Sequence, residues 1–233
     1  MKFKVSDEVF DKLEDVCFGI VVAKGIDNSG NIEEINDLLN NNIKRVEEYY
    51  VNKKVKESEE IRPYREAFRE LNINPNKYMS SIEAMTSRVA KNKKLPSINP
   101  IVDLGNAVSL KYLVPLGAHD IDDKNDDICV RFSKEDDVFI PFGSTNKESI
   151  DKDEIVYAIG NSVKTRRWIW RQGEVGKITS KTRNIFVPID GFRHSNFESV
   201  IKARDELANL FKEIFNCDVI VGLVDKNNKE INF

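Results

Sequence analysis

Apolar residues recur at helical spacing through most of the first 90 positions of the chain. The exception is the run 16–23 (VCFGIVVA), which is short, continuous and apolar and therefore predicts a strand buried on both faces. Apolar positions three or four residues apart then predict amphipathic helices in the segments 33–50, 63–71 and 79–89. The second of these has Pro63 in its first turn, where the missing N–H of proline costs no hydrogen bond.

A fourth helix is marked by its first residues. Asn99 followed by Pro100 is typical of an N-cap residue and the first helical position. The segment from Ile101 to Leu113 is apolar nearly all round, so we expect it to run through the interior of the protein. Pro115 then prevents much continuation of the helix.

Beyond residue 120 the pattern changes to an alternation of apolar and polar residues. Short alternating runs separated by polar, glycine-containing loops predict strands. These runs are 127–132, 137–142, 154–159, 166–171 and 184–189.

A last helix and a last strand follow. Ser195 and Glu198 have the spacing of a capping box for a helix that continues to Ile214, and the run 217–224 predicts a strand. Helices that come mainly first and antiparallel strands that come later predict one α/β domain, α+β-like, over residues 1–233. We expect a mixed sheet with packed helices rather than a doubly wound sheet.

Composition narrows the functional classes. The chain has 233 residues, with 36 Lys and Arg against 39 Asp and Glu and a formal net charge of −3. The whole protein therefore has no long-range attraction for nucleic acid, and binding a polyanion would need a local basic patch.

The cysteines, histidines and apolar runs indicate the compartment. Cys17, Cys129 and Cys217 lie far apart inside apolar runs, which predicts buried free thiols rather than disulfides or a zinc site. With only His119 and His194 besides, we expect neither a metal nor a cofactor. No run is long enough for a signal peptide or a membrane span, so the sequence predicts a cytoplasmic protein without membrane contact.

An aspartate-rich loop follows residue 119. Asp120, Asp122, Asp123, Asp126 and Asp127 could suggest calcium. The loop lacks the glycine and the terminal glutamate of an EF-hand loop, so a solvated turn is the favoured interpretation.

The predicted strand 166–171 (RRWIWR) is the most basic and aromatic part of the chain. Alternation places Arg166, Trp168 and Trp170 on one face of it. Tryptophan beside arginine offers single-stranded RNA a stacking surface and a phosphate contact. The window 164–183 holds seven basic residues against a single acid. The predicted RNA-binding residues are Arg166, Arg167, Trp168, Trp170, Arg171 and Lys177.

A structural interpretation of the same segment stays open beside the functional one. Trp168 and Trp170 would then be core residues, and the arginines would pair with the acids around 120–137.

Two blocks of the sequence resemble a known family. Residues 95–122 (LPSINPIVDLGNAVSLKYLVPLGAHDID) and 173–187 (GEVGKITSKTRNIFV) follow the pattern of the B3/B4 domain of bacterial phenylalanyl-tRNA synthetase β subunits. The resemblance is strongest over residues 60–193 and implies the B3/B4 fold. The matching residues are Ile98, Asn99, Val102, Asp103, Asn106, Pro115, Ala118, Asp120, Thr182, Asn184 and Ile185.

The resemblance also implies a site. In the synthetases this domain edits, because its pocket hydrolyses tRNA esters wrongly charged with tyrosine. The acidic pocket residue of the family falls on Glu174 and the asparagine at the helix start on Asn99. The pocket histidine falls on Gly117, and the nearest histidine is His119. The candidate catalytic residues are therefore Glu174, Asn99 and His119.

The substrate pocket of the family is altered here. Positions that the family keeps small, to make room for the substrate ring, fall on the bulky segment 166–170. Specificity for tyrosine is therefore not implied.

Three functions remain open. The chain could be a stand-alone domain that binds tRNA or its aminoacyl end. It could be a trans-editing deacylase that hydrolyses mischarged aminoacyl-tRNA in translation quality control. It could also be a non-catalytic binder of an amino acid or another small metabolite.

Overall fold

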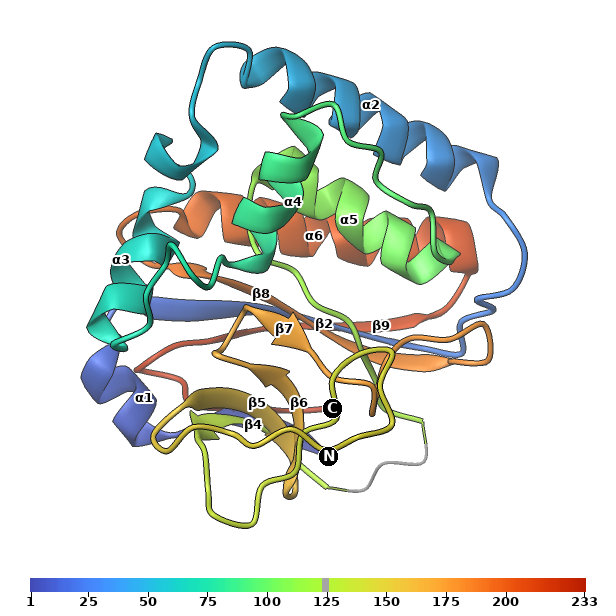
Figure 1. The fold of residues 1–233 in the computed structure, drawn as a ribbon. Coiled ribbons are helices and arrows are strands. Elements are labelled where there is room, and N and C mark those ends of the chain that lie inside the picture. The colour runs from blue at the N-terminus through green and yellow to red at the C-terminus, as the bar shows by residue number, and fades with distance from the viewer. Residues whose placement is uncertain (123–125) are drawn as a thin grey trace.

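Two β-sheets pack face to face at the centre of the fold, in a computed structural model that describes residues 1–122 and 126–233 (Figure 1). Within those residues the antiparallel four-stranded sheet has the order β3 (His119–Asp120), β8 (Asn184–Phe192), β2 (Val16–Lys24), β9 (Asp218–Val224). The six-stranded sheet has the order β10 (Glu230–Asn232), β1 (Lys2–Val5), β4 (Ile128–Phe132), β5 (Ile155–Ile159), β6 (Ser162–Arg166), β7 (Arg171–Gln172). The second sheet is mixed, because β1 runs parallel to β4 while the other pairs are antiparallel.

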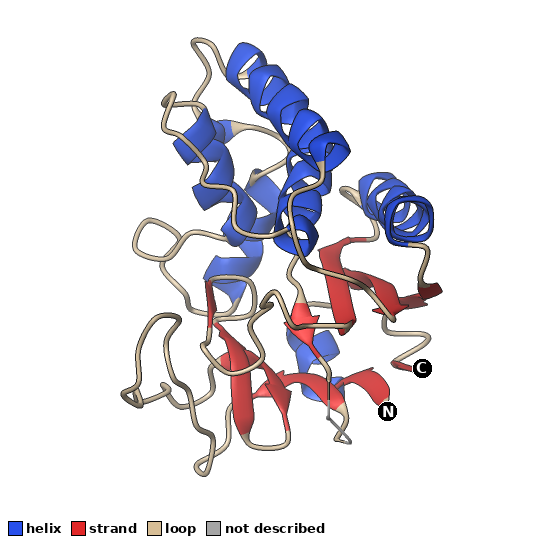
Figure 2. Cartoon of the chain, turned by 90° about the vertical axis from the view of Figure 1, so that its right-hand side faces the viewer, coloured by secondary structure: helices blue, strands red, loops and turns tan. Residues whose placement is uncertain are grey.

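The longer helices form layers on the outer face of the four-stranded sheet. Helix α6 packs on β2, β8 and β9, α5 packs on α6, and α2 packs on α5, so that helices gather at one end of the molecule (Figures 1 and 2). The helices are α1 (Asp7–Lys12), α2 (Glu33–Tyr49), α3 (Arg62–Glu70), α4 (Ser81–Val89), α5 (Pro100–Tyr112) and α6 (Phe197–Phe215), with a 3-10 turn at Val55–Glu57.

The core has two main parts, one on each face of β2. Between the sheets, Phe3 lies against Phe18, Tyr157 and Phe186. On the other face, apolar residues of α5 and α6 cover the four-stranded sheet. The prediction that residues 16–23 are buried on both faces is therefore confirmed, since each of them is buried.

The predicted α/β class, with a mixed sheet and packed helices, is confirmed. The predicted helices and most of the predicted strands appear within a few residues of their expected bounds. The sheet is split into two, and the short elements β1, α1, β3, β6, β7 and β10 were not predicted.

Segment 137–142 is not a strand, which corrects the prediction. It forms only isolated bridges, at Val138 to Ser162, Phe139 to Glu148 and Pro141 to Gly173. Pro141 has no N–H to donate to a regular ladder, so the pairing of this segment with β6 and with Gly173 stays limited to single bridges.

Segment 166–171 is not a strand either. Strand β6 ends at Arg166, β7 begins at Arg171, and the residues between them form a turn. Arg167 and Trp168 have φ angles of 45° and 61°, a left-handed conformation that is rare for bulky side chains. The predicted alternation of two faces is therefore wrong.

The start of α6 also differs from the prediction. Its N-cap residue is Asn196, and neither Ser195 nor Glu198 forms a capping box. The Asn196 side chain instead accepts a hydrogen bond from the Phe192 backbone N–H and donates one to the Tyr64 hydroxyl. It thereby fixes the end of β8 to α3.

The cysteines and the helices add two findings. All three cysteines are free, but only Cys17 is fully buried, whereas Cys129 and Cys217 are partly exposed. Among residues 1–122 and 126–233, no helix is both long enough and apolar enough to span a membrane.

Candidate functional site

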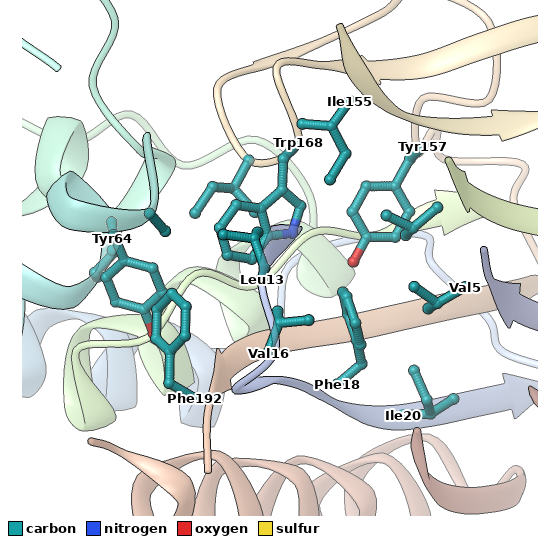
Figure 3. Close-up of a cluster of buried hydrophobic side chains, with 14 of the residues drawn as sticks. Val5, Leu13, Val16, Phe18, Ile20, Tyr64, Ile155, Tyr157, Trp168 and Phe192 are labelled. Atoms are coloured by element: carbon teal, nitrogen blue, oxygen red, sulfur yellow. The ribbon is translucent and has the colours of Figure 1, made fainter. Parts of the chain in front are cut away.

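A small cavity lies between the two sheets, beside the turn that follows β6. Its volume is about 90 Å³. Its walls come from α4, from the segment before β3, from β5 and β8, and from the turn itself. Figure 3 shows Trp168 and Tyr157 in the buried cluster on which the cavity borders. The lining residues are Ser81, Pro115, Leu116, Gly117, His119, Tyr157, Thr165, Trp168, Ile169, Trp170, Gln172, Pro188 and Asp190.

Asp190 is the acidic residue of this cavity. It sits in the otherwise apolar strand β8 and is only 2% exposed. One carboxylate oxygen, Oδ1, accepts hydrogen bonds from the Tyr157 hydroxyl at 2.6 Å and from the Trp168 indole N–H at 2.7 Å. Burial raises the pKa of Asp190 to about 7, although these two hydrogen bonds act in the opposite direction.

His119 lines the same cavity. It pairs with Phe186 through the β3–β8 ladder, and its ring stacks against Tyr157 at a centroid distance of 5.6 Å. Burial, and the nearby Lys164, lower the pKa of His119 to about 4, so the imidazole is neutral at pH 7. Its Nδ1 atom is enclosed without a hydrogen-bond partner among the described residues.

The side chain of His119 lies next to Gly117 in the fold. A Cβ atom on Gly117 would lie 3.8 Å from Nε2 of His119. The imidazole therefore reaches the space next to Gly117, even though it belongs to a residue two positions later.

A groove of about 270 Å³ adjoins the cavity. The two share Leu116, Gly117 and Gln172 in their walls. Two apolar side chains of the groove are exposed, Ile98 at 57% and Phe142 at 59%. The remaining lining residues are Ile101, Val102, Gly105, Asn106, Ala118, Lys177 and Ile178.

The three candidate catalytic residues do not come together. The side-chain oxygen of Asn99 caps α5 by accepting from the Val102 N–H, as predicted, and also accepts from Asn28. Asn99 lines neither the cavity nor the groove, and Glu174 lines neither of them. Of these three residues, His119 is the one that lines the cavity, together with Asp190, which the sequence did not indicate.

Glu174 lies at the rim of the groove. It forms an ion pair with Lys177 and accepts a hydrogen bond from the Gly143 backbone N–H at 2.8 Å. The hydrogen bond from Lys177, and then the one from Gly143, lower the pKa of this carboxyl. Glu174 is therefore ionised at neutral pH, and its carboxylate oxygens already bind Lys177 and Gly143.

The two arginines at the end of β6 are buried in ion pairs. Arg166 is 3% exposed, and its guanidinium lies 2.7 Å from Glu154 and 2.5 Å from Glu148. Arg167 is 7% exposed and pairs with Asp151 at 2.5 Å. Their partners are thus the acids of 148–154, which corrects the expected pairing with acids around 120–137.

These acids also explain the turn. Oε1 of Glu154 accepts a hydrogen bond from the Arg167 backbone N–H at 3.0 Å as well as from Arg166. The Trp168 backbone N–H donates to Ile155, and its indole donates to Asp190. Hydrogen bonds to two carboxylates and to the Ile155 carbonyl thus stabilise the left-handed backbone of the turn.

The other predicted RNA-binding residues are less enclosed. Trp168 is fully buried, whereas Trp170 is partly exposed and its ring lies 4.8 Å from that of Tyr78. Arg171 pairs with Glu148, and Lys177 with a carboxylate on its own loop. The assignment of these residues to RNA binding stays a prediction.

The aspartate-rich loop supports the backbone where it is described. Asp120 accepts a hydrogen bond from the Thr182 hydroxyl, and Asp122 accepts from the Arg183 and Asn184 backbone N–H groups. Asp123 lies outside the described residues. Within residues 1–122 and 126–233, no group of three or more His, Cys, Asp or Glu side chains is arranged to hold a metal ion.

The family model described as the B3/4 domain matches residues 63–216. An N-terminal fragment of the phenylalanyl-tRNA synthetase β subunit from Pyrococcus horikoshii has a similar fold, with a TM-score of 0.52 and 10% identity over 96% of this chain. The aligned region is 54% of that fragment, so the chain spans about half its length. No curated protein sequence matches the chain.

Proposed function

The chain belongs to the B3/4 domain family, and from this premise we propose that it binds the aminoacylated end of a tRNA where the groove and the cavity meet. The observation that carries the proposal is the shared wall of the two spaces at Gly117. An aminoacyl end has two parts, a nucleoside and an amino acid, and an ester joins them. A groove that adjoins a smaller cavity matches this division.

The groove suits the nucleoside part. Phe142 is 59% exposed, and the Lys177 ammonium lies over its ring at 5.5 Å from the centroid, so an aromatic surface and a cation are offered together to a nucleotide. Stacking of a base on an aromatic side chain stabilises single-stranded RNA ends without regard to sequence. Ile98 adds a second exposed apolar surface beside it.

Two cations near the groove suit the phosphates. Lys181 and Arg183 are exposed and make no ion pair with any side chain of the described residues. They belong to the loop that also carries Lys177 and Ile178 of the groove. Because phosphate contacts supply most of the sequence-independent affinity for RNA, these two residues replace the buried arginines as candidates.

The first test measures the binding of one tRNA with and without its amino acid. We expect the charged form to bind about tenfold more tightly, a difference of about 1.4 kcal/mol. The double variant Lys181→Ala/Arg183→Ala is expected to weaken both forms and to reduce the slope of log K against log salt by about 1 for each lost contact. Fluorescence anisotropy at several salt concentrations measures both quantities.

A second test uses a variant at Gly117, where the groove and the cavity share a wall. Gly117 has no positive φ, and a Cβ there makes ordinary contacts, so Gly117→Leu is compatible with the backbone. Its side chain would reach toward His119 and remove the preference for charged tRNA. Val175→Leu on the exposed loop is the matched control. Equal binding of charged and uncharged tRNA by the wild type would contradict the proposal.

One observation favours hydrolysis as a second candidate function. The His119 imidazole is neutral at pH 7, and its Nδ1 atom has no hydrogen-bond partner among the described residues, so this nitrogen can accept a hydrogen bond from water. Water would add to the ester carbonyl carbon, the C–O bond to the ribose would break, and the ribose oxygen would leave as a hydroxyl. The products are a free amino acid and an uncharged tRNA.

Release of labelled amino acid from a panel of aminoacyl-tRNAs tests this candidate. We expect His119→Gln to slow release about 100-fold, the typical effect of losing a general base. Glu174→Ala is expected to keep the wild-type rate, because that carboxylate is paired outside the cavity. If the protein does not speed the release of amino acid from any aminoacyl-tRNA, hydrolysis is excluded and only the binding proposal remains.

A further inference from the structure

We propose that the cavity is an ammonium site, in which Asp190 and His119 accept hydrogen bonds from a primary amine of a small ligand. The choice of ligand rests on the proposed function: it is an aminoacyl group with a free α-ammonium and a small side chain.

The carboxylate of Asp190 has one oxygen left for a ligand. Both hydrogen bonds that it receives, from Tyr157 and Trp168, end on Oδ1. No side chain or backbone N–H of the described residues donates to Oδ2, and Asp190 lines the cavity. The residue is 2% exposed, so a buried acceptor stands at the cavity wall without a donor.

His119 adds a second acceptor. It is 3% exposed and lines the cavity, and its Nδ1 atom has no hydrogen-bond partner among the described residues. A buried polar atom without a partner destabilises the protein, and a ligand that supplies the partner would recover this loss. A neutral imidazole can accept one hydrogen bond, whereas an ammonium group can donate three.

The remaining walls favour a cation over an anion. The cavity is lined by Asp190 but by no lysine or arginine of the described chain. Lys164 lies near His119 and acts on its charge, but it does not line the cavity. The Gln172 amide already donates to the Ala118 carbonyl. A carboxylate or phosphate would therefore find few donors here.

The size of the cavity limits the side chain of the ligand. A volume of about 90 Å³ is smaller than the engineered cavity of about 150 Å³ that admits benzene. Trp168, Ile169 and Trp170 contribute bulky side chains to its lining. A small aliphatic group fits this space, and a phenol ring does not.

Binding is expected to depend on the charge of Asp190. The titratable groups that act on Asp190 are Tyr157 on β5, Tyr64 on α3 and Cys17 on β2, and His119 on β3 lines the same cavity. Because the pKa of Asp190 is about 7, the carboxylate becomes available as the pH rises through 7. An alkyl ammonium with an ordinary pKa near 10.4 stays charged in this range, so about tenfold tighter binding is expected at pH 8 than at pH 6.

Calorimetric titration with small esters tests the site without tRNA. Alanine methyl ester is expected to bind, and N-acetylalanine methyl ester, which lacks the charge, to bind at least about tenfold more weakly. Tyrosine methyl ester is expected to bind as weakly as the acetylated ester because its ring exceeds the cavity. Ethylamine serves as the probe for the pH series.

Asp190→Asn separates charge from shape. The amide keeps an oxygen for Tyr157 and Trp168 but loses the charge, so we expect alanine methyl ester to bind at least about tenfold more weakly. The folded-state pKa of Asp190 lies above its unfolded value, so the ionised carboxylate opposes folding above pH 7. At pH 8 the variant is therefore expected to melt no lower than the wild type. Asp205→Asn on the surface of α6 is the matched control.

The outcomes distinguish this proposal from the proposed function. Equal binding of the acetylated and free esters, or full binding by folded Asp190→Asn, overturns the ammonium site. If charged tRNA binds but no ester does, the ammonium site also falls while the proposed function stands. If the esters bind and charged tRNA does not, the ammonium site stands and the chain is a binder of small amino-acid derivatives.

Discussion

Replacing Trp168 with alanine is expected to lower the free energy of unfolding by about 3–5 kcal/mol, the range for removing a large aromatic side chain from a core. The side chain is fully buried, and its ring lies 6.5 Å from that of Phe68 and 5.9 Å from that of Phe192 (Figure 3). The substitution also removes one of the two donors to Asp190. Urea unfolding followed by far-ultraviolet circular dichroism measures the change.

Trp170 provides the matched control, two residues later in the same turn. It is partly exposed and packs against Tyr78, so Trp170→Ala is expected to cost about 1 kcal/mol, the ordinary effect of a single substitution. A similar cost for the two variants would mean that Trp168 is not the residue that anchors the turn.

Glu154→Gln is expected to be about as damaging, at about 3–5 kcal/mol, because it leaves a buried cation without its main partner. The Glu154 side chain is 2% exposed and that of Arg166 is 3% exposed. Burial by itself would lower the pKa of the Arg166 guanidinium, but the hydrogen bond and charge of Glu154 outweigh it and raise that pKa. Urea unfolding at neutral pH gives the loss.

Two further variants measure how much the ion pairs of Arg166 contribute to the free energy of unfolding. Glu148→Gln removes a carboxylate that is 39% exposed, and we expect it to cost at most about 1 kcal/mol. The double variant Arg166→Met/Glu154→Met is expected to cost less than the sum of its single substitutions, since no unpaired charge remains between them. If Glu154→Gln is no worse than Glu148→Gln, the buried pair does not hold the turn.

Periodicity predicted the elements that depend on their own residues. The helices α2, α5 and α6 each bury one side or nearly all of their surface, and the spacing of their apolar residues shows it. The sequence also predicted the cap at Asn99, because its hydrogen-bond partner, the Val102 N–H, is only three residues away. The sequence pattern predicted a feature correctly where the residues that stabilise it lie close together in the sequence.

The turn after β6 could not be predicted in this way. The letters RRWIWR alternate as a strand does, but the residues that hold them lie far off in the sequence: Glu154 is 12 residues from Arg166, and Asp190 is 22 residues from Trp168. Those carboxylates stabilise a backbone that the alternation alone excludes. Tertiary partners outweighed the local pattern.

Asp190 is the site residue that sequence reasoning missed. The signal was present, because an aspartate interrupts the apolar strand NIFVPIDGF, and a buried acid must have partners or a function. The sequence did not indicate that His119 lines the same cavity, because this depends on a two-residue strand that pairs with β8 across 67 positions.

The position of the two tryptophans has an optical consequence. The chain contains no others, and both line the cavity. Indole emission responds to the polarity and hydrogen bonding of its surroundings, so all of the tryptophan fluorescence of this protein comes from one place. Entry of any molecule into the cavity is thus reported by the unlabelled chain, as a shift or quenching that no distant tryptophan dilutes.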